Sequence, residues 1–169
     1  MPRCRGDSGV TFTAKNRYAL EVLNAVLAGQ GGRLFTDLRD KQSLAYSVTS
    51  LVGLGVDYGS IAFYIASAPE KKEQAIKGLW DEINLVRAGL VPEDELERAK
   101  RWLIGNYEIG LQTNGSQAMD LALNELYGLG PDFVEKYAEE IKEVNAADVL
   151  EAARRFLNPE AYVLVEVGP

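Results

Sequence analysis

The sequence predicts an α+β domain of two layers, in which a mostly antiparallel sheet is covered on one face by several helices. Two neighbouring stretches alternate in character with a period of two, and a third lies near the end of the chain. A long series of segments with helical spacing separates them. Because a lone hairpin is only marginally stable, we expect all three strands to share one sheet, and the helices to bury their apolar stripes against one of its faces.

The first predicted helix follows a segment with little pattern. Residues 1–15 show only a weak strand signal at Val10–Thr13, so we expect a poorly defined N-terminal segment with at most a residual strand. A helix is expected over residues 16–28, where apolar side chains recur at helical spacing. It should end in the turn at 29–32 (GQGG), because glycine readily adopts the positive φ angles of a tight reversal.

A short helix and a hairpin should follow this turn. The helix is predicted over 32–41, with Leu34, Phe35 and Leu38 on its inner face. Strands are predicted over 45–52 (AYSVTSLV) and 58–67 (YGSIAFYIAS), since both are rich in β-branched and aromatic residues. The glycine-bearing connector between them favours an antiparallel hairpin.

Further helices and one strand complete the predicted domain, which spans residues 16–169. The first of these helices, after Pro69, carries an inner stripe made of Ile76, Leu79, Trp80, Ile83, Val86 and Leu90. A long helix should open at Pro92, helices should follow over 115–128 and 131–142, and Asn145 with Asp148 should cap the last one. The final strand is predicted over 161–167 (AYVLVEV).

The composition excludes several classes of function. The 169 residues include 25 acids and 18 bases, and the net charge of −7 disfavours a general nucleic-acid-binding protein. No apolar run approaches the about 18 residues of a membrane span. The chain has no histidine and one cysteine, Cys4, which excludes a His-ligated zinc, a Ser-His-Asp triad and an internal disulfide. If the protein belongs to an enzyme, we therefore expect its usual base and metal ligands to lie outside this chain; a carboxylate-only site for magnesium or calcium stays possible, but it would need converging acids.

Two features are candidates for binding chemistry. The glycine turn can expose backbone N–H groups, those of Gly31 and Gly32 among them, to anions or peptide carbonyls; the alternative is a plain helix-to-helix turn. Arg39 lies near the end of the short helix and Tyr46 near the start of the next strand, and the junction between them can bring the two side chains together. A guanidinium and a phenol together suit carbonyl oxygens, including one that gains negative charge during acyl transfer. The alternative is a surface arginine and a packed tyrosine.

Residues 31–48 (GGRLFTDLRDKQSLAYSV) resemble a known family, the pitrilysin/insulinase-type zinc metallopeptidases, which include the mitochondrial processing peptidases. In particular, the chain resembles the non-catalytic C-terminal domain of such a protein. The resemblance extends over about residues 17–168 and includes the segments ALEVLN at 19–24, ELERAK at 95–100 and LNP at 157–159. Family domains usually begin with a strand that ends in a Phe/Pro/Gly-rich segment, which residues 1–15 do not show well.

The resemblance implies a function. Family members pair α+β domains into halves that enclose a chamber, and an N-terminal domain or partner subunit holds zinc through an inverted His-x-x-Glu-His motif. The C-terminal domain contributes an arginine and a tyrosine that reach the substrate; Arg39 and Tyr46 match their spacing. The turn with Gly31 and Gly32 corresponds to a region implicated in peptide binding. The chain is thus predicted to bind substrate and close the chamber, without zinc or peptidase activity of its own.

The resemblance also implies partners and leaves alternatives open. The expected partners are the N-terminal peptidase domain or subunit and a peptide substrate, and the isolated domain should self-associate through exposed interface and sheet edge. One alternative is an inactive structural homologue acting as an assembly scaffold, like the core subunits of respiratory complexes; Arg39 and Tyr46 favour the peptidase role. A free-standing ligand-binding module is disfavoured because no polar pocket signature appears. Such relatives occur in bacterial cytoplasm and periplasm, so the compartment stays open.

Overall fold

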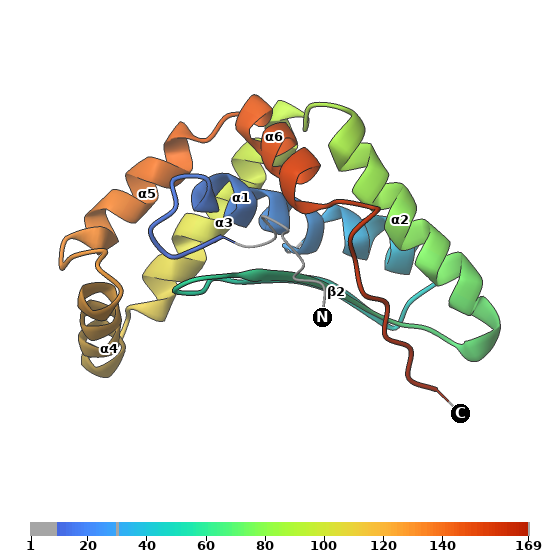
Figure 1. Ribbon diagram of the computed structural model, residues 1–169, viewed down its shortest axis with the longest axis horizontal. Coiled ribbons are helices and arrows are strands. Elements are labelled where there is room, and N and C mark those ends of the chain that lie inside the picture. Colours follow the sequence, from blue (N-terminus) through green and yellow to red (C-terminus); the bar gives the residue numbers. More distant parts are fainter. Residues whose placement is uncertain (1–9, 30, 169) are drawn as a thin grey trace, which may run out of the picture.

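Residues 10–29 and 31–168, which a computed structural model describes, form an arch with helices on its convex side and a two-stranded antiparallel sheet on its concave side (Figure 1). This arrangement confirms the predicted α+β fold. The elements are α1 (Arg17–Ala28), the π-helix η1 (Leu34–Lys41), β1 (Ser47–Gly53), β2 (Ser60–Ala66), the 3-10 helix η2 (Pro69–Lys71), α2 (Lys72–Ala88), α3 (Glu93–Gly110), α4 (Asn114–Leu126), α5 (Phe133–Glu143) and α6 (Ala146–Phe156).

The predicted hairpin is confirmed, with strand ends shifted by one or two residues. The pairs run from Ser47 opposite Ala66 to Gly53 opposite Ser60. Side chains alternate across the sheet, so that Ile61, Phe63 and Ile65 of β2 all pack against the core beneath the helices. The residues between them face away from the helices, and no element of the described part of the chain covers that side of the sheet (Figure 1).

The predicted strand over 161–167 is wrong. Residues 162–168 form no ladder with the described part of the chain and instead run along α2 (Figure 1). The ring of Tyr162 packs edge-on against Trp80 with centroids 4.8 Å apart, and Lys72 donates to Glu166 at 2.8 Å. A strand needs free backbone N–H and C=O groups alongside it, whereas α2 offers this segment only side chains.

The weak strand signal at Val10–Thr13 corresponds to a single parallel bridge. Thr11 pairs with Gly55, and the Phe12 N–H donates to the Gly55 carbonyl at 3.1 Å. The rest of the predicted N-terminal segment, residues 1–9, lies outside the described residues.

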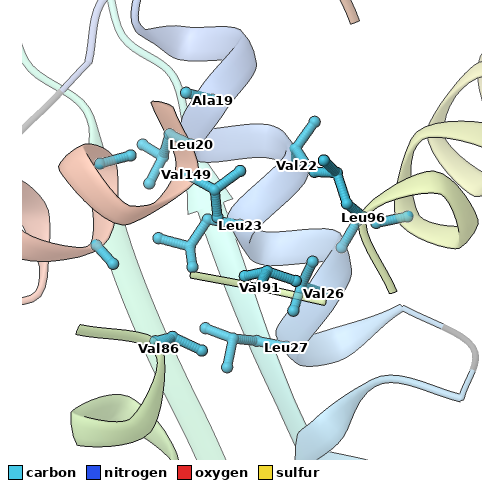
Figure 2. Packing of buried hydrophobic residues seen from close by; sticks show 14 of the residues in the cluster. Ala19, Leu20, Val22, Leu23, Val26, Leu27, Val86, Val91, Leu96 and Val149 are labelled. Atoms are coloured by element: carbon cyan, nitrogen blue, oxygen red, sulfur yellow. The ribbon is translucent and has the colours of Figure 1, made fainter. Parts of the chain in front are cut away.

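The core is built around α1, which is apolar on most of its circumference. Figure 2 shows Leu20 and Leu23 beside Val149 of α6. On another side of the helix, Val22 faces Leu96 of α3. All five side chains are buried. A helix packed between a sheet and other helices must be apolar nearly all round, and this accounts for the dense apolar spacing of its sequence.

The remaining helices confirm the predicted series. α3 begins directly after Pro92, and α6 begins with a complete capping box. In that box the Asn145 side chain accepts from the Asp148 N–H at 3.1 Å, while the Asp148 carboxylate accepts from the Asn145 N–H at 2.9 Å. One expected inner residue is misplaced: Leu90 is 62% exposed, because α2 has already ended at Ala88.

The helix α4 has an unusual orientation, with the polar residues Asp120 and Asn124 toward the body of the domain. Its only buried residue is Asn124, which donates to Asp120 at 2.7 Å, and Asp120 in turn accepts from the Tyr107 hydroxyl at 3.0 Å. The exposed apolar residues Met119, Ala122, Leu123 and Leu126, here called the α4 stripe, follow the i, i+3, i+4, i+7 spacing of a helix-pairing face. Met119 and Leu126 are 62% and 74% exposed. The helix therefore presents to solvent the face that a buried helix would hide.

Candidate functional site

Arg39 projects from the π-helix η1 into solvent. Its guanidinium lies over the ring of Phe35, one turn earlier, with 4.5 Å between Cζ and the ring centroid. With the described part of the chain it forms no hydrogen bond or ion pair. The prediction that Phe35 lies on the inner face of this helix is wrong: Leu34 and Leu38 are buried, whereas Phe35 is 37% exposed and serves as a platform for Arg39.

Tyr46 stands just before the first strand. Its backbone N–H donates to the carbonyl of Ala66 at 2.8 Å, which extends the hairpin pairing by one bond. Its side chain is 76% exposed, and the phenol makes no hydrogen bond with any described residue. The tyrosine is therefore not a packed residue, and its hydroxyl is available to a ligand.

Arg39 and Tyr46 lie on either side of the chain reversal between η1 and β1. The Leu44 N–H donates to the Leu38 carbonyl at 2.8 Å, and the Ser43 N–H donates to the Arg39 carbonyl at 3.1 Å. Ser43 adopts a left-handed conformation with φ of 50°, which turns the chain toward the sheet. Arg39 and Tyr46 are both exposed, and no hydrogen bond joins their side chains.

The glycine turn separates Gly31 and Gly32 into different environments. Gly31 is exposed and has a φ of 73°, a conformation that favours glycine. Gly32 is buried, its N–H donates to the Gly29 carbonyl at 2.6 Å, and its carbonyl accepts from the Thr36 N–H at 3.0 Å. The backbone groups of Gly32 are thus engaged within the turn, and Gly31 is the member of the pair that faces solvent.

An ion pair and a buried carboxyl, neither of which the sequence indicated, lie beside η1. The Arg33 guanidinium donates to the Glu95 carboxylate at 2.8 Å, which ties the start of η1 to the first turn of α3. Glu82 of α2 is only 6% exposed, and its Oε2 finds no partner among the described residues. Burial raises the pKa of the Glu82 carboxyl, nearby Asp37 adds to the rise, and Arg33 and Lys41 oppose it.

A buried polar network joins α1 to α5 on the other side of the domain. Glu21 accepts from Arg17 at 3.0 Å and from the Tyr137 hydroxyl at 2.8 Å. Burial, together with the Glu21 charge, raises the pKa of the Tyr137 phenol. The pKa of the neighbouring Tyr107 rises to about 12, chiefly through burial.

This network lines an open pocket of about 300 Å³, which the sequence analysis did not foresee. Its residues are far apart in the chain, so no local pattern could reveal it. Each oxygen of the Glu21 carboxylate already accepts one hydrogen bond, from the arginine or the tyrosine, and these bonds tie α1 to α5.

Two kinds of feature are missing from the part of the chain that the structure describes. No group of three or more His, Cys, Asp or Glu side chains gathers closely enough there to hold a metal ion. Zinc needs such nitrogen, sulfur or carboxylate ligands, so the described residues do not fit a zinc site. Among the same residues, no helix has the length and apolar character needed to cross a membrane.

Comparison with known proteins gives consistent similarities. The family model described as the peptidase M16 inactive domain matches residues 8–103. The chain is 31% identical over 165 residues to a Streptomyces coelicolor protein named uncharacterized zinc protease SCO5738. This alignment covers 97% of this chain and 36% of the relative. The chain thus spans about a third of the length of this curated relative.

Solved structures share the fold. The peptidase M16 inactive domain from Pseudomonas fluorescens aligns with a TM-score of 0.80 at 24% identity, covering 89% of this chain and 36% of the other. The inactive peptidase domain from Bordetella parapertussis aligns with a TM-score of 0.77 at 18% identity, covering 89% of this chain and 82% of the other. At these identities the likeness establishes the arrangement of the elements alone.

Proposed function

Because this chain belongs to the peptidase M16 inactive-domain family, we propose that it is the substrate-binding and chamber-closing domain of a zinc-dependent endopeptidase. In this proposal residues 16–169 act as one domain, and the zinc is held by an N-terminal peptidase domain or a partner subunit. The proposal is supported by the zinc-protease names of relatives about three times as long as this chain, and by the lack of a fitting ligand set among the described residues. The chain alone then has no peptidase activity.

The observation that carries the proposal is the state of Arg39 and Tyr46. A surface arginine in an acidic chain readily finds a carboxylate, and a tyrosine next to a sheet readily packs into it. Here the guanidinium has no acidic partner in the described part of the chain, and the phenol is 76% exposed. Both polar groups are therefore available to an external acceptor.

The chemistry of the pair suits a peptide backbone. Arg39 carries a permanent charge, and its stacking on Phe35 restricts the rotamers of its long side chain, so less entropy is lost when it donates to a carbonyl. Tyr46 offers one hydroxyl donor at the first backbone pair of the hairpin. In the assembled peptidase one of these donors strengthens its bond as the tetrahedral oxyanion forms.

The α4 stripe supports the chamber-closing part of the proposal. Apolar side chains at helix-pairing spacing lose water favourably when another apolar surface covers them. We assign this stripe to contact with the zinc-bearing domain. In the isolated chain the α4 stripe and the edges of the hairpin strands lead to self-association, which light scattering at increasing protein concentration would detect.

The test uses the assembled peptidase with Arg39→Ala and Tyr46→Phe. Removing a donor that acts on the transition state lowers kcat by about 10²–10³. We expect Tyr46→Phe to lower turnover more than stability, and Arg39→Ala to raise KM and lower kcat. Tyr58→Phe is the matched control, because Tyr58 is 81% exposed in the hairpin connector.

The thermal melt of each variant accompanies its kinetics. Normal activity in both variants, with unchanged melting, would refute the substrate-binding role and favour the scaffold alternative. A loss confined to KM would instead mean that the pair binds substrate equally in the ground and transition states.

A further inference from the structure

The side of the hairpin that no described element covers, here called the outer hairpin face, consists of every second residue of both strands. Its members are Ser47, Thr49, Leu51 and Gly53 of β1 and Ser60, Ala62, Tyr64 and Ala66 of β2. None of them is charged, although a quarter of the whole chain is. The water-facing side of an antiparallel sheet is usually polar, so an uncharged face that exposes Leu51 by 58% and Tyr64 by 53% is unusual.

The large and small side chains on this face are spaced like the alternate side chains of an extended peptide. Along β2 a large ring, Tyr64, stands between two small residues, Ala62 and Ala66. Side chains on one face of a strand repeat every two residues, or about 6.8 Å, and the alternate side chains of an extended peptide repeat at the same distance. Two such side chains can therefore lie over the two alanines, one on each side of the ring.

The outer hairpin face begins next to Tyr46 along the chain. Ala66, at its end, accepts the backbone hydrogen bond of Tyr46 and pairs with Ser47, the next residue in the chain. Leu51 lies opposite Ala62, diagonally across from Tyr64, so the two exposed apolar side chains are neighbours. The whole face lies on the concave side of the arch, away from the helices (Figure 1).

We propose that the outer hairpin face selects the substrate: it binds an extended peptide segment whose alternate side chains are uncharged and apolar. This inference rests on the proposed function and deepens it. Apolar side chains gain by covering Leu51 and Tyr64, whereas a lysine or aspartate at the same place loses water and finds no charge of opposite sign on the face. Leu51, Ala62 and Tyr64 then determine specificity, while Arg39 and Tyr46 bind the peptide backbone.

The test is an amide-detected NMR titration of the ¹⁵N-labelled chain with three capped Gly/Ser peptides. They carry two leucines, two lysines or two aspartates at positions i and i+2 of an otherwise identical sequence. We expect shifts in the β1 and β2 amides, and a Kd for the leucine peptide at least about tenfold lower than for either charged peptide. Leu51→Ser should weaken the leucine peptide, while Leu90→Ser, the matched control at 62% exposure outside the sheet, should leave it unchanged.

A second variant distinguishes specificity from folding. Ala62→Glu adds one carboxylate to the face and should shift the preference toward the lysine peptide, whereas Ala147→Glu, at an exposed alanine of α6, should not. A preference for charged peptides, or no response to Ala62→Glu, overturns the inference while leaving the proposed function intact. Binding of none of the three peptides counts against both. If the amide signals of β1 and β2 shift as the protein concentration rises, with no peptide present, a second copy of the chain occupies the face. This result also overturns the inference.

Discussion

Replacing Glu82 by glutamine should stabilise the domain at neutral and alkaline pH. Glu82 lies on α2, is 6% exposed, and its Oε2 has no partner among the described residues. Burial, reinforced by Asp37, raises the pKa of its carboxyl above the ordinary 4.5. The folded state therefore resists the charged form of this side chain, and glutamine removes the charge while keeping nearly the same shape.

The pH dependence follows from proton linkage. Between pH 4.5 and the higher pKa of the folded state, the native protein holds a proton that the unfolded chain has released. The free energy of unfolding consequently falls as the pH rises through this window, and the full penalty is present above it. A buried polar group without a partner costs about 1–3 kcal/mol, and more when it is charged, so glutamine removes only the added cost of the charge. We expect Glu82→Gln to gain about 1–2 kcal/mol at pH 8 and much less near pH 4.5.

Urea unfolding at both pH values measures the effect. Glu73→Gln is the control, because Glu73 lies on the same helix with a side chain 88% exposed, and its replacement should change stability by less than about 0.5 kcal/mol. If Glu82→Gln is less stable than the parent chain at pH 8, or if its gain is equal at both pH values, the reasoning is refuted. In that case the carboxylate has a partner that stabilises its charge.

Three further substitutions test local parts of the structure. Tyr137→Phe removes a hydrogen bond of 2.8 Å to the Glu21 carboxylate and should lower the free energy of unfolding by about 1.5–3 kcal/mol in a urea titration. An unchanged free energy of unfolding would mean that this hydrogen bond does not stabilise the fold. Asn145→Ala removes the capping box and should cost about 1 kcal/mol, seen as a lower Tm, and an unchanged Tm would contradict the cap. Gly32→Ala should be strongly destabilising because a Cβ would lie 2.7 Å from the Leu27 carbonyl oxygen, whereas Gly115→Ala meets nothing closer than 3.9 Å; equal melting of both would count against the turn geometry.

The local elements of this protein could be predicted from its sequence. The helices and the hairpin depend on the spacing of nearby residues, and the cap at Asn145 depends on a side chain three positions from its partner. The place of Arg39 in the short helix and of Tyr46 just before the first strand follows in the same way, since both depend on local pattern. The chain itself encodes such features because the interacting groups are neighbours along it.

Long-range contacts could be decided only by the tertiary structure. The ion pair of Arg33 with Glu95 and the hydrogen bond of Tyr137 to Glu21 join residues 62 and 116 positions apart, which no local pattern records. The segment 161–167 has the residues of a strand, yet it lies along α2, because a strand forms only where a neighbour offers free backbone groups. The α4 stripe faces solvent because a polar contact to Tyr107 sets the rotation of the helix. Periodicity reveals that a face exists, but only the surrounding elements determine which face is buried.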